Sequence, residues 1–216
     1  MKNQSELFGH PKGLFYLFFA ELWERFSYYG MRALLTLYMV NEFFSWMTDE
    51  AYREEVSFGI FAAYGSLVYA TPVLGGMIAD KFIGFKKSIM LGGILMALGH
   101  FFMAFYFDTD MFGFDATSIN NFFFYAALAL LIIGNGFFKP NISTMVGRLY
   151  TEGDDRRDSG FTIFYMGINA GAFLAPLACG WLGYEFGWHY GFGAAGVGMI
   201  AGLLVFMKGM NDGVFG

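Results

Sequence analysis

The fold is decided by the first long apolar stretch of the chain. Residues 14–40 read LFYLFFAELWERFSYYGMRALLTLYMV. A helix needs roughly 20 mostly apolar residues to cross a bilayer, and this stretch is long enough. It also contains four charged side chains, and each charge at a bilayer centre costs at least about 2.5 kcal/mol on insertion scales. The sequence therefore predicts a membrane-spanning helix whose charged side faces protein or a water-filled cavity.

Five further apolar stretches of similar length follow. The six predicted spans are residues 14–40, 56–79, 88–107, 121–149, 160–181 and 190–207. Their length and their lack of period-two alternation exclude strands and an outer-membrane barrel. Only 14% of the 216 residues are charged and 56% are hydrophobic, whereas soluble domains carry about 25% charged residues. We therefore expect an all-α bundle of six transmembrane helices, with residues 1–216 forming one domain.

The charges between the predicted spans alternate in sign. The first, third and fifth connections contain a single base, Arg53, and several acids. The N-terminal segment, the second and fourth connections and the segment after the sixth span contain the others: Lys2, Lys12, Lys81, Lys86, Lys87, Arg148, Arg156, Arg157 and Lys208. Because Lys and Arg accumulate on the cytoplasmic side of membrane proteins, the pattern predicts a multi-pass protein with a cytoplasmic N-terminus.

The ionisable residues of the first span share one face of the predicted helix. At 100° per residue, four side chains fall within about 60° of one another: Glu21, Arg25, Tyr28 and Arg32. Glu24 and Tyr29 flank this polar stripe on opposite sides. The i,i+4 spacing of Glu21 and Arg25, with the acid first, favours an intrahelical ion pair. The stripe is a candidate proton-binding site; the alternative is that its ion pairs only fix helix packing, although buried ion pairs are poor stabilisers.

The fourth span contains a lysine next to a proline. Lys139 lies near the middle of the span and Pro140 follows it. Proline removes a backbone hydrogen bond, so we expect the helix to kink or loosen there. A lysine beside an interrupted backbone suits a mid-membrane binding point for an anionic group. The alternative is a lysine that snorkels to the membrane interface.

Two further polar residues are candidates. Asn169 lies in the fifth span between Gly167 and Gly171, whose small face predicts a close helix contact. Asn169 suits either a hydrogen bond between helices or a contact to a ligand. Asp80 lies at the exit of the second span, before Lys81. It suits either a gate latch or an ordinary solvated loop residue.

The sequence offers little support for an enzyme. It has one cysteine, three scattered histidines and no phosphate-binding glycine loop ending in Lys-Ser/Thr. We therefore expect no catalytic residues, no metal site and no cofactor. The net charge of −5 argues against a nucleic-acid partner.

Several stretches resemble the signatures of the proton-dependent oligopeptide transporters, a family within the major facilitator superfamily. Residues 21–30 match the family's pattern Glu-x-x-Glu-Arg-Phe-x-Tyr-Tyr-Gly, and residues 164–171 match Phe-Tyr-x-x-Ile-Asn-x-Gly. Lys139-Pro140-Asn141 matches the family's fourth-helix lysine region, and residues 75–84 resemble its second-helix exit motif more loosely. The resemblance covers nearly the whole chain, with the motifs in the family's order.

The resemblance implies import of di- and tripeptides by alternating access, with protons as the coupling ion. It implies proton coupling by Glu21, Glu24, Arg25 and Lys139, and gating at Asp80. The substrate-binding residues that it implies are Arg25, Arg32, Tyr29, Tyr69, Lys139 and Asn169, with Tyr64 as a weaker candidate. The bases would attract the carboxylate of the peptide, and the tyrosines and asparagine would line the site and contact the peptide backbone.

Members of this family have a second six-helix half that forms the other wall of the cavity. We therefore expect this chain to be the N-terminal half of a twelve-helix protein of the bacterial inner membrane. Its expected partners are peptides, protons, the lipid bilayer, and either the missing half or a second copy of the chain. Two alternatives stay open: a related facilitator for another anionic solute such as nitrate, and a membrane interaction subunit that does not transport.

Overall fold

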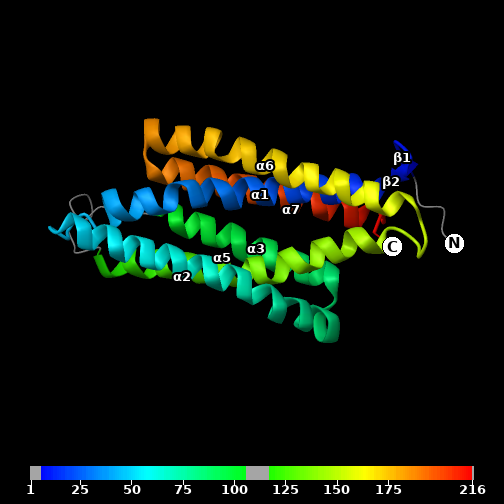
Figure 1. Ribbon diagram of the computed structural model, residues 1–216, viewed down its shortest axis with the longest axis horizontal. Helices are drawn as coiled ribbons and strands as arrows, with labels where there is room; N and C mark the ends of the chain where they lie inside the picture. The colour runs from blue at the N-terminus through cyan, green and yellow to red at the C-terminus, as the bar shows by residue number, and fades with distance from the viewer. Residues whose placement is uncertain (1–5, 106–116, 216) are drawn as a thin grey trace.

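The structure is a computed structural model that describes residues 6–105 and 117–215. The described residues form six long helices and a short antiparallel hairpin (Figure 1). The helices are α1 (Lys12–Tyr38), α2 (Glu50–Ile78), α3 (Phe85–Ala104), α5 (Thr117–Arg148), α6 (Arg156–Phe186) and α7 (Trp188–Asn211). A π-helical turn continues α1 (η1, Met39–Phe43) and another continues α2 (η2, Ala79–Ile83), and the hairpin pairs β1 (Glu6–Leu7) with β2 (His10–Pro11).

Each predicted span falls on one of these helices, and several helices extend beyond it. Helix α2 begins six residues before the predicted span, because the carboxylate of Asp49 caps it by accepting a hydrogen bond from the Tyr52 N–H at 3.2 Å. The last two residues of the predicted third span, 106 and 107, lie outside the described residues. Among the helices of the described residues, five qualify as membrane spans by length and composition. Helix α1 is not among them, since its charged side chains interrupt the apolar run.

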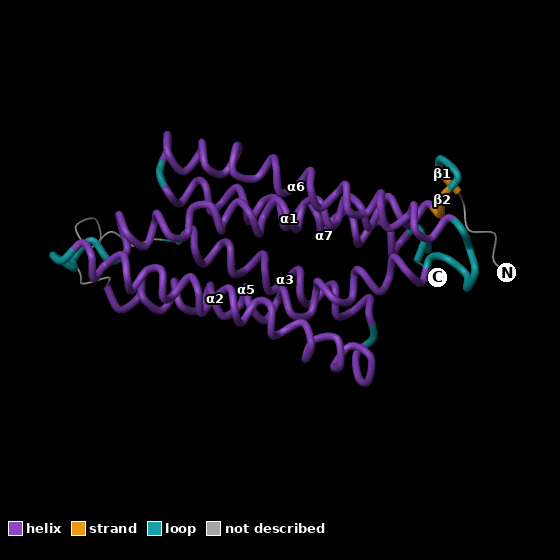
Figure 2. Tube along the Cα trace, viewed as in Figure 1, coloured by secondary structure: helices purple, strands orange, loops and turns teal. Residues whose placement is uncertain are grey.

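The helices form two groups of three. Helices α1, α6 and α7 pack together, and α2, α3 and α5 pack together (Figure 1). The two groups meet chiefly along α3 and α7, whereas α1 has few contacts with α2 or α5. The tube in Figure 2 follows the same two layers along the length of the molecule. This arrangement leaves the polar stripe of α1 facing the space between the groups.

Glycines set the closest helix crossings. Gly75 of α2 packs on the backbone of Gly136 of α5, and Gly92 of α3 packs on α5 at Gly134, where an added Cβ would lie 2.6 Å from a carbonyl oxygen. Small residues let helix backbones approach closely, and in membranes van der Waals packing of this kind drives helix association. Glycine contacts therefore pack α5 closely against both α2 and α3, and these two contacts fix the rotation of α5 about its own axis.

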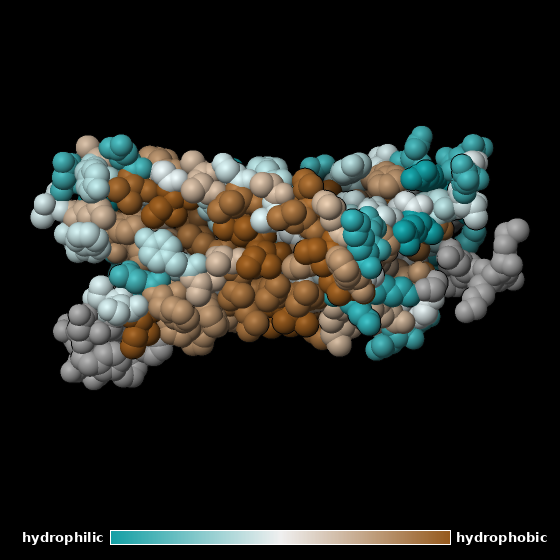
Figure 3. Space-filling view, turned by 90° about the horizontal axis from the view of Figure 1, so that it is seen from below, coloured by the Kyte–Doolittle hydropathy of each residue, from teal (hydrophilic) through white to brown (hydrophobic). Residues whose placement is uncertain are grey.

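Basic residues gather at one end of the bundle. The α2–α3 connection, the α5–α6 connection and the end of α7 lie at the same end as the two termini (Figure 1). Viewed from below, a broad apolar band covers the middle of the molecule, and hydrophilic side chains gather at this end (Figure 3). The described part of the chain thus places its basic connections on one side of an apolar band, as the alternation of loop charges predicts. The acids of the predicted third connection at positions 108, 110 and 115 lie outside the described residues.

Candidate functional site

A buried ion-pair cluster lies in the middle of α1. The Arg25 guanidinium donates to both carboxylate oxygens of Glu24, with Nη2 2.6 Å from Oε1, and its Nε lies 3.2 Å from Oε1 of Glu21. The three residues are at most 3% exposed. Charges buried to this degree persist only when they are paired and hydrogen-bonded. The predicted Glu21–Arg25 pair is present. The two hydrogen bonds of Arg25, however, go to Glu24, which the sequence placed beside the polar stripe and not in it.

Helix α6 packs closely against the turn of α1 that contains this cluster. Gly171 packs against α1 at the turn that carries the cluster, so that an added Cβ would lie 3.0 Å from the Arg25 Cβ. One turn earlier, Gly167 packs against Phe18 in the same way. The small face that the sequence predicts for this helix is confirmed. Its contact with α1 fixes the distance between the two helices at the depth of the ion pairs.

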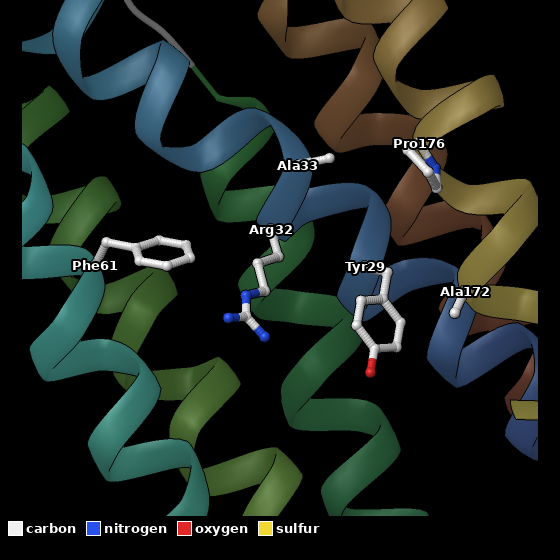
Figure 4. A pocket seen from close by; sticks show the side chains of 6 residues that line it. All are labelled: Tyr29, Arg32, Ala33, Phe61, Ala172 and Pro176. Atoms are coloured by element: carbon white, nitrogen blue, oxygen red, sulfur yellow. The ribbon is translucent and has the colours of Figure 1, made fainter. Parts of the chain in front are cut away.

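A cavity of about 310 Å³ opens beside the cluster, toward the extracellular end that the loop charges predict. Its lining comes from α1, α2 and α6: Tyr29, Arg32, Ala33, Phe61, Ala172 and Pro176. The Arg32 side chain leaves α1 toward the side of the cavity formed by Phe61, and Ala172 and Pro176 lie on the other side (Figure 4). The Arg32 guanidinium lies 5.1 Å from the centre of the Phe61 ring, which is within cation–π distance. The cavity therefore offers a positive charge beside apolar and aromatic walls.

Lys139 of α5 lies on the opposite helix group and near the ion-pair cluster. Its Nζ is 5.2 Å from the centre of the Tyr69 ring of α2. Its charge is also within electrostatic range of Glu21. The structure thus brings Lys139 and Tyr69 together and sets the lysine across from the first-helix carboxylates.

The backbone beside Lys139 is not interrupted. Helix α5 runs without a break through Pro140 from Thr117 to Arg148, so the expected interruption of the backbone is wrong, whereas the expected kink stays a prediction. The amide of Asn141 donates to the carbonyl of Phe137 at 2.7 Å, and the hydroxyl of Thr144 donates to the carbonyl of Pro140 at 2.9 Å. A Cβ added at Gly76 of α2 would lie 3.7 Å from the Cβ of Pro140, an ordinary van der Waals contact. Both hydrogen bonds run to carbonyls one turn earlier, so they add side-chain contacts to the helix around the proline.

The remaining predicted residues take different positions. Tyr64 of α2 is buried, at 3% exposure, and lies within electrostatic range of Glu24 and Arg25. Asn169 is exposed on α6, three residues before Ala172, and does not line the cavity of Figure 4. Asp80 is exposed in the turn η2 at the basic end of the bundle, away from the cluster. The roles predicted for these residues stay predictions.

Sequence reasoning missed three residues at this site. Phe61 looks like any other apolar residue of a long span, and only its spacing of three from Tyr64 places it on a polar face. Tyr28 lies in the predicted stripe but was not chosen, although its ring stacks 5.1 Å from the Arg25 guanidinium. Asn135 is 1% exposed on α5, one turn from Lys139. A polar residue between two glycines at mid-span was the signal that could have found it.

The chain is similar in sequence to known transporters. It is 47% identical over 203 residues to an uncharacterized transporter, YclF, of Bacillus subtilis, covering 94% of this chain and 38% of that protein. It is 42% identical over 208 residues to a di-/tripeptide transporter of Lactococcus lactis, covering 96% of this chain and 39% of that one. The chain thus spans less than half the length of these relatives.

Solved structures give the same result for the fold. A mutant of the peptide transporter POT in complex with alafosfalin matches with a TM-score of 0.84 and 44% identity, over 98% of this chain and 41% of that one. With its apolar helices and transporter relatives, this chain is a multi-pass membrane protein. The model of the POT family matches residues 86–212, which is more than half of the chain. The glycine-packed bundle, the buried arginine between two glutamates and these matches agree, and the chain belongs to the POT family of transporters.

Proposed function

We propose that this chain forms the N-terminal half of a proton-coupled symporter of di- and tripeptides in the bacterial inner membrane. The single observation that carries the proposal is the buried Arg25 held between Glu21 and Glu24, with Lys139 within electrostatic range of Glu21. The two relatives named for peptides, the Lactococcus transporter and POT, support the choice of substrate.

Proton coupling follows from the charge balance of the cluster. With both carboxylates ionised, the acids Glu21 and Glu24 balance the bases Arg25 and Lys139. A proton taken up by one carboxylate weakens its hold on a base and leaves one positive charge in excess. That charge is free to attract an anion from the cavity, because opposite charges in a low-dielectric interior interact strongly. Proton uptake and binding of an anionic substrate therefore favour each other.

Peptide binding follows from the bases that reach the space between the helix groups. Arg32 lines the cavity and Lys139 lies beside Tyr69 on the other helix group, and both bases suit the carboxylate of a peptide. Tyr29 lines the same cavity and Tyr69 stacks on Lys139. Their hydroxyls suit hydrogen bonds to the peptide backbone. Asn169 would join them only if α6 turns or the partner half guides the peptide toward it.

A partner completes the cavity in this proposal. Tyr69 of α2 is 64% exposed, and Arg32 of α1 and Lys139 of α5 are half-buried, so this part of the site is open to a partner. A second six-helix half would supply the other wall, and alternating access would then be a rocking of one half against the other. The basic end of the bundle faces the cytoplasm, in line with the positive-inside rule, which places the N-terminus there.

The test is uptake of a labelled dipeptide into proteoliposomes under an imposed pH gradient, inside alkaline. The 216-residue chain is compared with a twelve-helix protein that contains it. We expect uptake by the twelve-helix protein only, competed by unlabelled dipeptide. Glu21→Gln should abolish gradient-driven uptake, because it removes one of the two proton-binding carboxylates. Glu185→Gln, an acid exposed at the end of α6, is the matched control and should leave uptake unchanged.

Each other outcome has a definite meaning. Uptake by the 216-residue chain would mean that two copies assemble a complete pathway. Uptake of nitrate or another anion without competition by dipeptides would favour the other-solute alternative. No gradient-driven uptake of any solute by the twelve-helix protein would contradict the proposal.

A further inference from the structure

Arg32 is a cation that the fold leaves without a counter-charge. The residue is half-buried on α1, and its guanidinium forms neither a salt bridge nor a hydrogen bond with any described residue. Arg25, two turns earlier on the same helix, is by contrast held by Glu21 and Glu24. Taking a charge out of water costs free energy unless the charge is paired. The unpaired guanidinium is therefore suited to an anion that reaches it in the assembled protein.

An uncharged side chain lies against this guanidinium. The centre of the Phe61 ring of α2 is 5.1 Å from the Cζ atom of Arg32, and both side chains line the cavity of about 310 Å³ (Figure 4). The face of an aromatic ring attracts a cation, although the ring carries no net charge. A carboxylate in the place of Phe61 would pair with Arg32 and compete with an incoming anion. A ring restricts the long side chain and leaves its charge uncompensated.

The second base of the site has the same kind of neighbour. The Nζ of Lys139 lies 5.2 Å from the centre of the Tyr69 ring, which also belongs to α2, and it forms no salt bridge with a described residue. At both positions α2 contributes an aromatic ring and not an acid. The ring of Phe61 has no hydroxyl, so it offers a peptide no hydrogen bond of its own. Its electrostatic effect at this site is confined to the contact with Arg32.

We propose that Phe61 is a positioning residue for peptide binding: its ring holds the Arg32 guanidinium at the wall of the cavity without neutralising it, which keeps the charge ready for the carboxylate of a peptide. The inference rests on the proposed function, and it assigns to Phe61 an effect that passes through Arg32. An arginine side chain gives up rotational freedom when it binds, so one that is already held loses less. Loss of the ring should weaken binding and leave the maximal rate of transport as it is.

The first test compares Phe61→Leu with the parent twelve-helix protein. Leucine keeps the position apolar and removes the ring. We expect the calorimetric Kd for a dipeptide and the KM of gradient-driven uptake to rise about twofold to fivefold, the range of a cation–π contact at a partly exposed site. Phe61→Tyr restores the ring and should restore the affinity. Phe58→Leu, one turn away on α2 and 56% exposed, is the matched control and should bind as the parent does.

A double-mutant cycle shows whether Phe61 acts through Arg32. If it does, Phe61→Leu should raise the Kd in the parent protein and have no further effect in Arg32→Met. Equal effects in both backgrounds would mean that Phe61 touches the peptide itself, and they would overturn the inference. An unchanged affinity of Phe61→Leu, or a loss that Phe61→Tyr does not reverse, would overturn it as well.

A spectroscopic measurement separates the inference from the proposed function. The ring current of an aromatic side chain shifts the NMR signals of protons that lie over the ring. The guanidinium signal of Arg32, identified by its absence in Arg32→Met, should therefore move in Phe61→Leu and stay in place in Phe58→Leu. An unmoved signal in Phe61→Leu overturns the inference. Absence of dipeptide binding and uptake in the parent protein would instead contradict the proposed function, and the NMR result would still decide whether Phe61 holds Arg32.

Discussion

Gly171 of α6 lies directly behind Arg25 of α1, at a distance that leaves no room for a side chain. A Cβ added at Gly171 would lie 3.0 Å from the Cβ of Arg25 and 3.0 Å from the backbone nitrogen of Phe26. The glycine and the arginine come from two motifs that are far apart in the sequence. One motif supplies the charge, and the other sets how closely a second helix approaches it.

Gly171→Ala should therefore damage the ion-pair cluster. The added methyl group pushes α6 from α1, and overpacking of this kind costs about 1–3 kcal/mol. We expect a lower midpoint of thermal unfolding in detergent and reduced dipeptide uptake. Gly180→Ala, on the same helix, meets no atom within 4 Å and should unfold at the same temperature or slightly above it. Equal effects of the two substitutions would mean that helix propensity, and not the contact with Arg25, explains the result.

Replacing Arg25 alone should lower the stability of the protein more than replacing Arg25 and Glu24 together. Arg25→Met leaves Glu21 and Glu24 buried with no cation between them, and breaking a buried pair in this way costs about 3–5 kcal/mol. Adding Glu24→Gln to Arg25→Met should recover part of that loss, because it removes one uncompensated charge. Thermal unfolding of the three proteins checks this. If the double variant is the least stable, the two residues contribute independently.

Lys139→Met tests whether this lysine serves binding or packing. Methionine keeps much of the length of the side chain and removes the charge. We expect dipeptide affinity to fall by about tenfold to a hundredfold, the effect of one hydrogen bond to a charged group. The unfolding midpoint should change little. Calorimetric binding to the twelve-helix protein measures the effect, with Lys87→Met, an exposed lysine at the basic end, as control. Lower stability with unchanged binding would favour the alternative of a non-transporting subunit.

Hydrogen bonds from Arg156 join the N-terminal hairpin to the α5–α6 connection, and we call this set of contacts to Asp154, Glu6 and Gly9 the clasp. Arg156 donates to Asp154 at 2.8 Å, to Glu6 at 2.8 Å and to the carbonyl of Gly9 at 3.0 Å. The hydrogen bonds from the Arg156 side chain, and then from its backbone N–H, lower the pKa of Asp154 from 3.8 to about 2. Because the folded pKa is the lower one, the contribution of Asp154 is complete above about pH 4 and is lost as the pH falls through 2.

The clasp should therefore be insensitive to pH between 5 and 8. A spin label at Phe8→Cys reports the mobility of the hairpin, since Phe8 is 85% exposed and Cys179 is buried. We expect low mobility from pH 8 to 5 and a rise below about pH 3. Arg156→Gln should raise mobility at every pH, whereas Arg157→Gln should not. A hairpin that is equally mobile in the parent protein and in Arg156→Gln would rule out the clasp.

The six helices could be predicted from the sequence because the signal for each is long and repeated. Apolar runs of this length, with bases on alternate connections, leave few other arrangements. The pairing of Arg25 could be predicted only in part. Helical spacing identifies Glu21 as a neighbour, since residues four apart lie on one face, but adjacent residues point 100° apart. The long arginine side chain bends back to Glu24, and that choice of rotamer depends on packing against other helices.

Interactions between helices were the hardest to predict. Pro140 suggested an interrupted backbone, yet α5 is continuous there, with side-chain hydrogen bonds from Asn141 and Thr144 to carbonyls one turn earlier. Phe61 lines the cavity only because α2 lies where it does, and nothing in the local pattern of α2 fixes which side faces α1. Such positions become visible once the helices are packed.

The seam between the two helix groups has a mechanical consequence. The groups meet chiefly along α3 and α7, while the cavity opens between α1 and α2. A contact of this kind suits a hinge: a small rotation of one helix group about it would move the helices far from the contact much more than α3 and α7 themselves. Such a turn would change the separation of Lys139 from Glu21, and with it the strength of their attraction. Gly93 of α3 lies against Leu203 of α7 on this seam, where a Cβ added at Gly93 would overlap a methyl group of Leu203, so a larger residue at position 93 would push the two groups apart.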